Sequence, residues 1–345
     1  MIRVLKWLAV PIVLMIGVLG AVMWWQGEMQ KPLALSEPTL LTIPQGASGQ
    51  QVVRLIEQHN WLESNPFAVK LWLKFVFSPQ SAKAGTYQIQ PAMKLTDAFS
   101  LFANAEEFQF GVSLIEGLTL QQWLLILQQH EYITFDISDE TLVALQDKWP
   151  VPPASGTPSL EGLLLADTYY FTAGTDASTI LARAMAAMSR YLESAWAERA
   201  TGLPLKTPYE ALILASIIEK ETAVPAERAR IAGVFINRLN ENMRLQTDPT
   251  VIYGVGVEFD GNLTRQHLRE STPYNTYVVK GLPPTPIAMA GKPAIQAALH
   301  PFPTDELYFV ARGDGSHHFS STLKEHNEAV NQYQIRSGNR NTNDG

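Results

Sequence analysis

An uncharged hydrophobic run from Trp7 to Trp25 opens the pattern of hydrophobic and polar positions. Its length of about 19 residues is close to the ~20 that an α-helix needs to cross a bilayer. Arg3 and Lys6 precede the run, and a basic flank of this kind marks the cytoplasmic side of a membrane helix. We therefore expect residues 1–6 in the cytoplasm, a membrane helix at 7–25, and the rest of the chain on the other side of that membrane.

A cleaved signal peptide is the alternative for the same run. Such a peptide has a shorter apolar stretch and ends in a small-x-small cleavage site. Here the stretch is long and ends in Trp24 and Trp25, which suit an aromatic belt at the membrane interface better than a cleavage site. The pattern favours a retained anchor.

Beyond a polar linker at 26–38, the pattern predicts a small module over residues 39–105. Alternation of apolar and polar residues predicts strands, and helical apolar spacing predicts helices. The expected order is strand, helix, helix, strand, followed by a third helix. These elements are Thr39–Ile43, Ser48–His59, Asn65–Phe77, Ala84–Ile89 and Thr96–Phe102.

The larger part of the chain, residues 106–335, mixes strands and helices irregularly. We expect a strand at Phe108–Ile115 and helices at Thr119–Gln129 and Ser178–Ala200. The stretch Trp149–Pro158 is rich in Pro, Gly and Ser and predicts a long loop. The polar residues 336–345 are expected to be disordered. The fold class expected for the whole is α+β.

A buried helix that ends on a carboxylate is the sharpest chemical signal. Thr207 and Pro208 match a helix N-cap followed by proline at the first helical position, with Glu210 completing a capping box. The helix then stays apolar almost all round until Ile218, which indicates burial. It closes with the sequence Glu-Lys-Glu-Thr, residues 219–222.

Helical spacing singles out the second of these two glutamates. Glu221 continues the stripe of Leu214, Ile217 and Ile218, whereas Glu219 lies nearly opposite and is interpreted, with Lys220, as a surface charge. Partial burial and the negative end of the helix dipole both raise the pKa of a carboxyl there. A carboxylic acid kept protonated near neutral pH can act as a general acid. The alternative is an ordinary solvated charge at a helix end.

Downstream clusters of amide, hydroxyl and aromatic side chains suit a sugar, which offers C–H faces and hydroxyl edges. The alternative is a set of loop caps and turns, since Asn, Asp and Thr serve these roles routinely, and Asp-Pro at 248–249 favours a turn. The candidate substrate-binding residues are Gln246, Asp248, Thr250, Tyr253, Tyr274, Asn275, Thr276 and Tyr277.

Composition narrows the chemistry further. The net charge of −7 argues against a nucleic-acid partner, and the absence of cysteine excludes disulfides and thiolate chemistry. The histidines show no metal-ligand spacing, and no serine lies in a nucleophile elbow. We therefore expect no metal and no cofactor.

Several of these motifs closely resemble the endolytic murein transglycosylase family, also described as YceG-like. The resemblance covers the chain from the anchor to about Tyr333. It is carried by Glu219–Thr222, Phe235–Leu239, Leu245–Tyr253, Tyr274–Tyr277 and Gly281–Pro284, while Ala84–Tyr87 resembles part of a LysM-like module. Two loop positions, Ala166 and Ala290, depart from the prolines common in the family.

The resemblance implies a membrane-bound lyase on the outer side of the bacterial cytoplasmic membrane. This enzyme would cut inside peptidoglycan glycan strands, between N-acetylmuramic acid and N-acetylglucosamine, leaving 1,6-anhydro ends. It implies Glu221 as the catalytic residue and an association with penicillin-binding synthases. A tether close to the membrane favours nascent strands as the substrate. Two other functions stay open: a non-catalytic glycan-binding scaffold, and a muramidase-type hydrolase.

Overall fold

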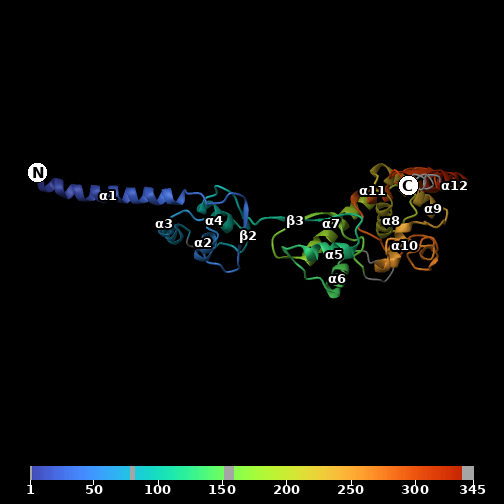
Figure 1. Cartoon of the computed structure of the whole chain (residues 1–345), viewed down its shortest axis with the longest axis horizontal. Helices are drawn as coiled ribbons and strands as arrows, with labels where there is room; N and C mark the ends of the chain where they lie inside the picture. Colours follow the sequence, from blue (N-terminus) through green and yellow to red (C-terminus); the bar gives the residue numbers. More distant parts are fainter. Residues whose placement is uncertain (1, 78–81, 151–158, 336–345) are drawn as a thin grey trace, which may run out of the picture. The chain divides into compact units, whose positions relative to one another are not determined.

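The computed structural model describes residues 2–77, 82–150 and 159–335. Residues 151–158 of the loop expected at 149–158, and the tail expected at 336–345, lie outside these ranges. The chain divides into two compact units (Figure 1). The first comprises residues 1–110 with 171–173, and the second 111–170 with 174–345. The mixture of helices and strands confirms the α+β class.

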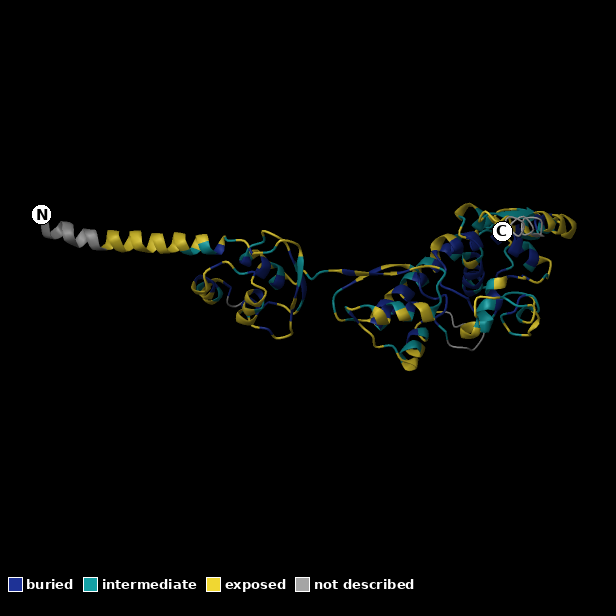
Figure 2. Ribbon diagram, viewed as in Figure 1, coloured by how far each residue is buried: buried dark blue, intermediate teal, exposed yellow. Residues whose placement is uncertain are grey.

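The first unit begins with the long helix α1, Ile2–Met29. Within the described residues this is the one helix long and apolar enough to cross a membrane, over Pro11–Met29. Its apolar side chains from Ile12 to Met23 are exposed, as Figure 2 shows, which is unfavourable in water and suits a lipid environment.

The strand–helix–helix–strand order expected after α1 is observed. It consists of β1 (Thr39–Ile43), α2 (Gly49–Gln58), α3 (Pro66–Trp72) with a π-helical turn η1 (Leu73–Phe77), and β2 (Gly85–Ile89). The two strands pair antiparallel, with Thr39 opposite Ile89. Helix α4 (Leu95–Asn104) completes a core in which Tyr87, Phe99 and Phe102 are fully buried.

Helix α1 is joined to the first unit by specific contacts at its last turn. Trp25 donates from Nε1 to the carbonyl of Ala68 at 3.0 Å, and the backbone N–H of Asn65 donates to Glu28 Oε2 at 2.7 Å. Met29 and Leu33 are buried in the same core. Part of the segment expected as a linker therefore packs against this unit.

The N-terminal part of the second unit contains two small sheets and three helices. Strands β3 (Phe110–Leu114) and β5 (Asp167–Phe171) form one sheet, and β4 (Ile133–Thr134) pairs parallel with β6 (Thr175–Asp176). The helices are α5 (Leu120–Gln129), α6 (Asp139–Gln146) and α7 (Ala177–Ala197).

In the remaining part of the second unit, helix α8 (Pro208–Glu221) is buried from Ala211 to Ile218 (Figure 2). Thr207 caps it by accepting the N–H of Glu210, while the Glu210 carboxylate accepts the N–H of Lys206, one residue before the cap position that a full capping box uses. The other elements are η2 (Pro225–Glu227), α9 (Arg228–Asn240), α10 (Asp248–Val255), η3 (Gly256–Glu258), η4 (His267–Arg269), α11 (Lys292–Leu299), β7 (Tyr308–Ala311), β8 (His317–Ser320), α12 (Leu323–Val330) and η5 (Asn331–Ile335).

Two local features explain how these elements fit together. Gly233 lets α9 lie close to the loop between α11 and β7, because a Cβ at residue 233 would lie 2.5 Å from the carbonyl oxygen of Phe302 in that loop. Asp248 and Pro249, interpreted from the sequence as a turn, instead begin α10. That interpretation was wrong because Asp and Pro also suit the first turn of a helix, where a negative charge is favourable and the proline N–H is not needed.

Packing of α5 gives a direct test of where the core lies. Leu127 is fully buried and Leu125, on the same helix, is 48% exposed. We expect Leu127→Ala to lower the free energy of unfolding by about 2–5 kcal/mol and Leu125→Ala by less than about 1 kcal/mol. Urea unfolding of both purified variants measures the difference, and equal losses would contradict this packing.

Candidate active site

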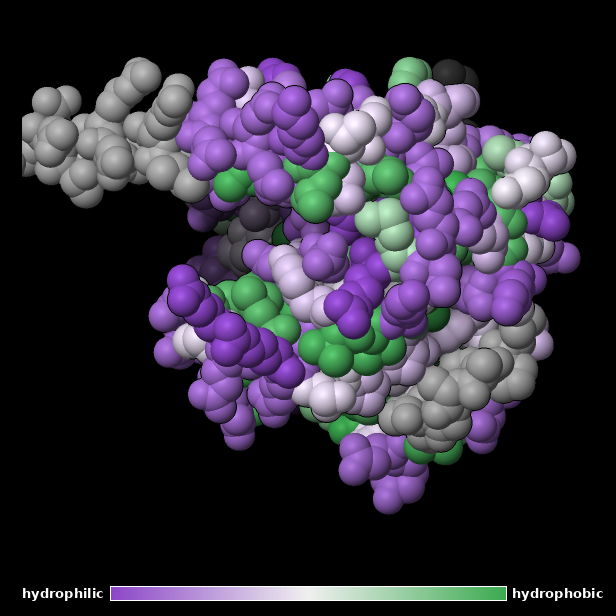
Figure 3. All heavy atoms as spheres, turned by 90° about the vertical axis from the view of Figure 1, so that its right-hand side faces the viewer, coloured by the Kyte–Doolittle hydropathy of each residue, from purple (hydrophilic) through white to green (hydrophobic). Residues whose placement is uncertain are grey.

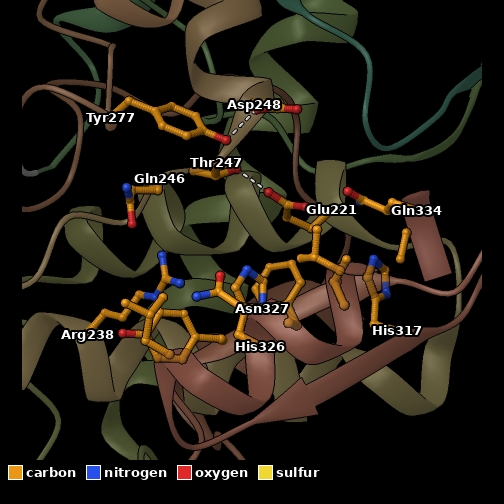
Figure 4. Close-up of a pocket in the computed structure, with 16 residues that line it drawn as sticks. Glu221, Arg238, Gln246, Thr247, Asp248, Tyr277, His317, His326, Asn327 and Gln334 are labelled. Atoms are coloured by element: carbon orange, nitrogen blue, oxygen red, sulfur yellow. Dashed lines mark hydrogen bonds between the residues drawn. The ribbon is translucent and has the colours of Figure 1, made fainter. Parts of the chain in front are cut away.

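A cavity of about 480 Å³ lies at the C-terminal end of α8 (Figure 4). Figure 3, which faces this part of the chain, shows a mostly hydrophilic surface with small hydrophobic areas and a hollow left of its centre. Segments far apart in sequence line the cavity. The lining residues are Glu221, Arg238, Gln246, Thr247, Asp248, Tyr277, Tyr308, Phe309, Val310, Ala311, His317, Leu323, His326, Asn327, Val330 and Gln334.

Glu221 is the last residue of α8, and its carboxyl group lies in the cavity wall. Burial raises the pKa of this carboxyl, and the nearby Asp248 charge adds to the rise. The hydroxyl of Thr247 donates a hydrogen bond to Oε1, which acts in the opposite direction and fixes the orientation of the group. The second oxygen, Oε2, remains free to carry a proton, as a general acid requires.

The other glutamate of the motif has a structural role. The side chain of Glu219 is only 4% exposed, pairs with Arg228 at 3.2 Å and accepts the backbone N–H of Gly291 at 2.9 Å. The expectation of a surface charge was therefore wrong, because the loop at Gly291 covers that face of α8. Lys220 is exposed and donates to the carbonyl of Gly117 at 3.0 Å.

Arg238, on α9, is a buried cation in the cavity wall. Its Nε donates to the carbonyl of Leu307 at 2.6 Å, and its Nη1 donates to those of Leu245 and Arg244 at 2.7 and 3.3 Å. Among the described residues, Nη2 forms no hydrogen bond. The guanidinium therefore joins α9 to Leu307, the residue before β7, and to the loop before α10, and its Nη2 stays available on the cavity side.

The loop that carries Gln246 and Thr247 is held in an unusual backbone conformation. Gln246 has φ of 51°, the left-handed region that non-glycine residues rarely adopt. Its N–H donates to the carbonyl of Thr276 at 3.1 Å, and the N–H of Thr247 donates to Thr276 Oγ1 at 3.1 Å. Backbone strain of this kind concentrates at functional sites, and here it places the exposed Gln246 side chain at the cavity.

The aromatic edge of the site is set by a short hydrogen bond. The hydroxyl of Tyr277 donates to Asp248 Oδ1 at 2.6 Å, as drawn in Figure 4. Burial, together with this hydrogen bond, raises the pKa of Tyr277, so its hydroxyl stays protonated. The pair gives the cavity a rigid rim with one free carboxylate oxygen.

The structure brings four of the nine candidate residues to the cavity and places five behind it. Glu221, Gln246, Asp248 and Tyr277 line the cavity. Thr250 and Thr276 are buried and bond to one another at 2.8 Å, and Asn275 donates to the carbonyls of His267 and Glu270. Tyr253 donates to Glu161 at 3.3 Å, and Tyr274 bonds Thr285 at 2.8 Å.

The opposite wall comes from the β7–β8 hairpin and α12, which the sequence did not single out. His317 Nδ1 lies 2.8 Å from Glu227 Oε2, and Glu227 Oε1 accepts the backbone N–H of His317 at 2.9 Å. The ring of His326 stacks on Tyr308 with centroids 5.2 Å apart. Sequence spacing tests these histidines only as metal ligands, because Glu227 and Tyr308 lie too far away along the chain to be paired with them by spacing. No group of described His, Cys, Asp and Glu residues is arranged to hold a metal.

A second buried carboxyl, Glu161, lies behind the site. It is 4% exposed, and both its oxygens accept the N–H of Leu120 at the start of α5, at 3.0 and 3.1 Å. Burial raises its pKa to about 7, while the hydrogen bonds from Leu120 and Tyr253 act in the opposite direction. The adjacent Gly162 is required because a Cβ there would lie 2.3 Å from Pro286.

Comparison with known proteins settles the family. Residues 41–332 match the YceG-like family. A Bacillus subtilis protein named endolytic murein transglycosylase is 32% identical over 92% of this chain and 91% of its own length. This chain belongs to the YceG-like family. Like the relatives that bear this name, it is a lyase-type enzyme.

More distant matches agree with this assignment. A Streptococcus pneumoniae endolytic murein transglycosylase is 26% identical over 84% of this YceG-like chain and 57% of its own length. The crystal structure of a YceG-like protein from Listeria monocytogenes superposes with a TM-score of 0.56 at 29% identity. It covers 85% of this chain and 99% of its own.

The buried Glu161 of this YceG-like chain predicts a pH-dependent stability. Its pKa is raised from 4.5 to about 7, so its contribution is fully present below pH 4.5 and is lost as the pH rises through 7. The loss amounts to about 3 kcal/mol. Urea unfolding at pH 5 and pH 8 should show a smaller pH difference in Glu161→Gln than in the wild type. Glu193→Gln, on the exposed face of α7, should keep the wild-type difference.

Proposed function

We propose that this chain is an endolytic lytic transglycosylase of peptidoglycan. It cleaves the bond between N-acetylmuramic acid and N-acetylglucosamine within glycan strands and leaves 1,6-anhydro ends. The observation that carries the proposal is the Glu221 carboxyl, buried and oriented in the wall of a cavity whose rim offers amide, hydroxyl and aromatic groups. The names of its relatives support murein as the substrate.

In the proposed mechanism Glu221 acts twice. Its Oε2 proton first passes to the glycosidic oxygen, so that the N-acetylglucosamine leaving group departs as an alcohol. The resulting carboxylate then takes the proton from the C6 hydroxyl of the muramic residue as this oxygen bonds to C1. Because the nucleophile is already part of the substrate, its proximity replaces both the water and the second carboxylate of an ordinary glycosidase.

Neighbouring residues then have definable roles in this scheme. Thr247 holds the carboxyl in place, and its hydroxyl stabilises the ionised form between the two proton transfers. Arg238, whose charge favours the ionised state of Glu221, supports the same intermediate. Gln246 and the Tyr277–Asp248 pair orient the saccharide. The five candidates behind the cavity support the loops that carry these groups.

The proposed layout places this chemistry beside a membrane. Helix α1 crosses the bilayer with its N-terminus in the cytoplasm, residues 39–105 form a LysM-like module that binds glycan, and residues 106–335 form the catalytic domain. The apolar surface of α1 and the observed strand–helix–helix–strand order support this layout. Nascent strands near the membrane are the proposed substrate, and penicillin-binding synthases are the proposed partners.

A muramidase-type hydrolase is the second candidate, and one observation favours it. Asp248 lines the same cavity as Glu221 and supplies a second carboxylate, as most glycosidases require. Its hydrogen bond to Tyr277 occupies one oxygen and leaves the other free. A non-catalytic scaffold is the third candidate.

Product analysis separates these three functions. Mass spectrometry of digested glycan should show 1,6-anhydro products from the wild type and none above background from Glu221→Gln, because the general acid is lost. Products heavier by one water would indicate the hydrolase, and the absence of cleavage would indicate the scaffold.

The variant Asp248→Asn distinguishes the hydrolase from the lyase. A hydrolase that uses Asp248 should lose activity as completely as Glu221→Gln, whereas the lyase should retain measurable anhydro product.

Removal of the Thr247 hydroxyl should change the pH profile in a defined direction. The Thr247 hydrogen bond lowers the pKa of Glu221, so Thr247→Val should raise that pKa and move the alkaline limb of kcat/KM to higher pH. We expect kcat at the optimum to fall about tenfold as well, because the carboxyl loses its orientation. Thr247→Ser keeps the hydroxyl and should resemble the wild type. An alkaline limb that stays in place or moves to lower pH in Thr247→Val would contradict the assigned interaction.

A further inference from the structure

A group of apolar side chains is exposed on α3 and η1 of the first unit. Phe67, Phe75 and Val76 are 62%, 69% and 56% exposed. The opposite side of this segment, with Val69, Trp72 and Phe77, is packed into the core. The segment is therefore amphipathic, with aromatic residues on the side that a soluble protein would cover with polar groups.

Contacts with α1 fix the direction in which this segment runs. The N–H of Asn65, at the start of α3, donates to Glu28. The carbonyl of Ala68, three residues later, accepts from Trp25, which lies three residues before Glu28 in α1. Progress along α3 therefore corresponds to movement back along α1. Trp25 and Glu28 both lie at the end of the apolar stretch Pro11–Met29, so α3 runs toward the membrane that this stretch would cross.

Helix geometry gives the depth of the apolar group. Seven residues separate Phe75 from Ala68, and at a rise of at most 1.5 Å per residue through α3 and η1 they span at most about 10 Å along the segment. Amphipathic helices that lie in a membrane interface bury their apolar side by about 5–10 Å. Trp24 and Trp25 mark the interface on α1 itself, since tryptophan concentrates at that level.

Charge on the same segment agrees with this placement. Lys70 and Lys74 are exposed beside the phenylalanines, and the ammonium of Lys74 lies 5.3 Å from the centre of the Phe75 ring. Lysines bordering an apolar surface can extend to anionic lipid headgroups while their methylene chains stay in the apolar layer.

We propose that α3 and η1 form a second membrane contact, in which Phe67, Phe75 and Val76 enter the headgroup and upper acyl region of the bilayer crossed by α1. The inference rests on the proposed membrane anchor and goes beyond it. The first unit would then be held to the membrane at two places. The module would keep a fixed orientation to the lipid surface and would not turn freely at the end of a helix.

The absence of cysteine in this chain allows a direct test. Single cysteines at Leu19, Phe75 and Gln45 carry an environment-sensitive fluorophore in the full chain, reconstituted into lipid nanodiscs with nitroxide-labelled acyl chains. Leu19 lies within the α1 span, and Gln45 lies in the exposed polar turn that follows β1. The inference expects quenching at Leu19 and at Phe75, with Phe75 at least about twofold above Gln45.

The outcomes separate the inference from the anchor. Quenching at Leu19, with quenching at Phe75 no stronger than at Gln45, would overturn the membrane contact and leave the anchor standing. The same result is expected if a protein partner, and not lipid, covers this surface. No quenching at Leu19 would overturn the anchor and this inference together. A Phe67→Asp change added to the Phe75→Cys chain should reduce its quenching, because a charge at the interface opposes insertion. Unchanged quenching at position 75 would contradict the proposal that Phe67 and Phe75 enter the membrane as one surface. Phe67 is exposed, so this change should leave the fold intact.

Discussion

The burial of one carboxyl group at the end of an apolar helix is the constraint on which the rest of the second unit depends. The helix α8, which ends on Glu221, is apolar along nearly its whole length and must be covered by other elements. Helices α9 and α11 pack against it. The carboxyl then needs a polar partner at the one place where the helix ends. Thr247 provides this partner because Gln246, in the loop before α10, adopts a left-handed backbone conformation that is unfavourable for a residue other than glycine.

That loop is stabilised from both sides by hydrogen bonds to backbone atoms. Arg238 donates to two carbonyls of this loop and to the carbonyl of Leu307, just before β7. Thr276 accepts two successive N–H groups of the loop. Both supports act largely through the main chain, so they fix the path of the loop and leave its side chains free to vary. The residues behind the cavity therefore shape the site without needing to touch a substrate.

Much of this arrangement follows from local sequence patterns, and the rest depends on contacts that no local pattern contains. The cap at Thr207, the apolar length of α8 and the choice of Glu221 over Glu219 come from helical periodicity alone. The buried ion pair of Glu219 with Arg228 does not, because it requires the loop at Gly291 to cover the outer face of α8. The same holds for the pairing of His317 with Glu227 across 90 residues. Asp248 was placed in a turn because Asp-Pro is compatible with both a turn and a helix start, and only the packing of α10 decides between them.

The order of the cavity walls along the chain has a consequence for biosynthesis. Glu221 lies near the middle of the second unit, and the opposite wall is built from β7, β8 and α12, close to the end of the described residues. A chain that emerges N-terminus first cannot close its cavity until nearly all of it has left the ribosome. If the proposed function is right, this enzyme stays inactive toward its substrate until its synthesis is nearly complete, because of the sequence order of the cavity walls.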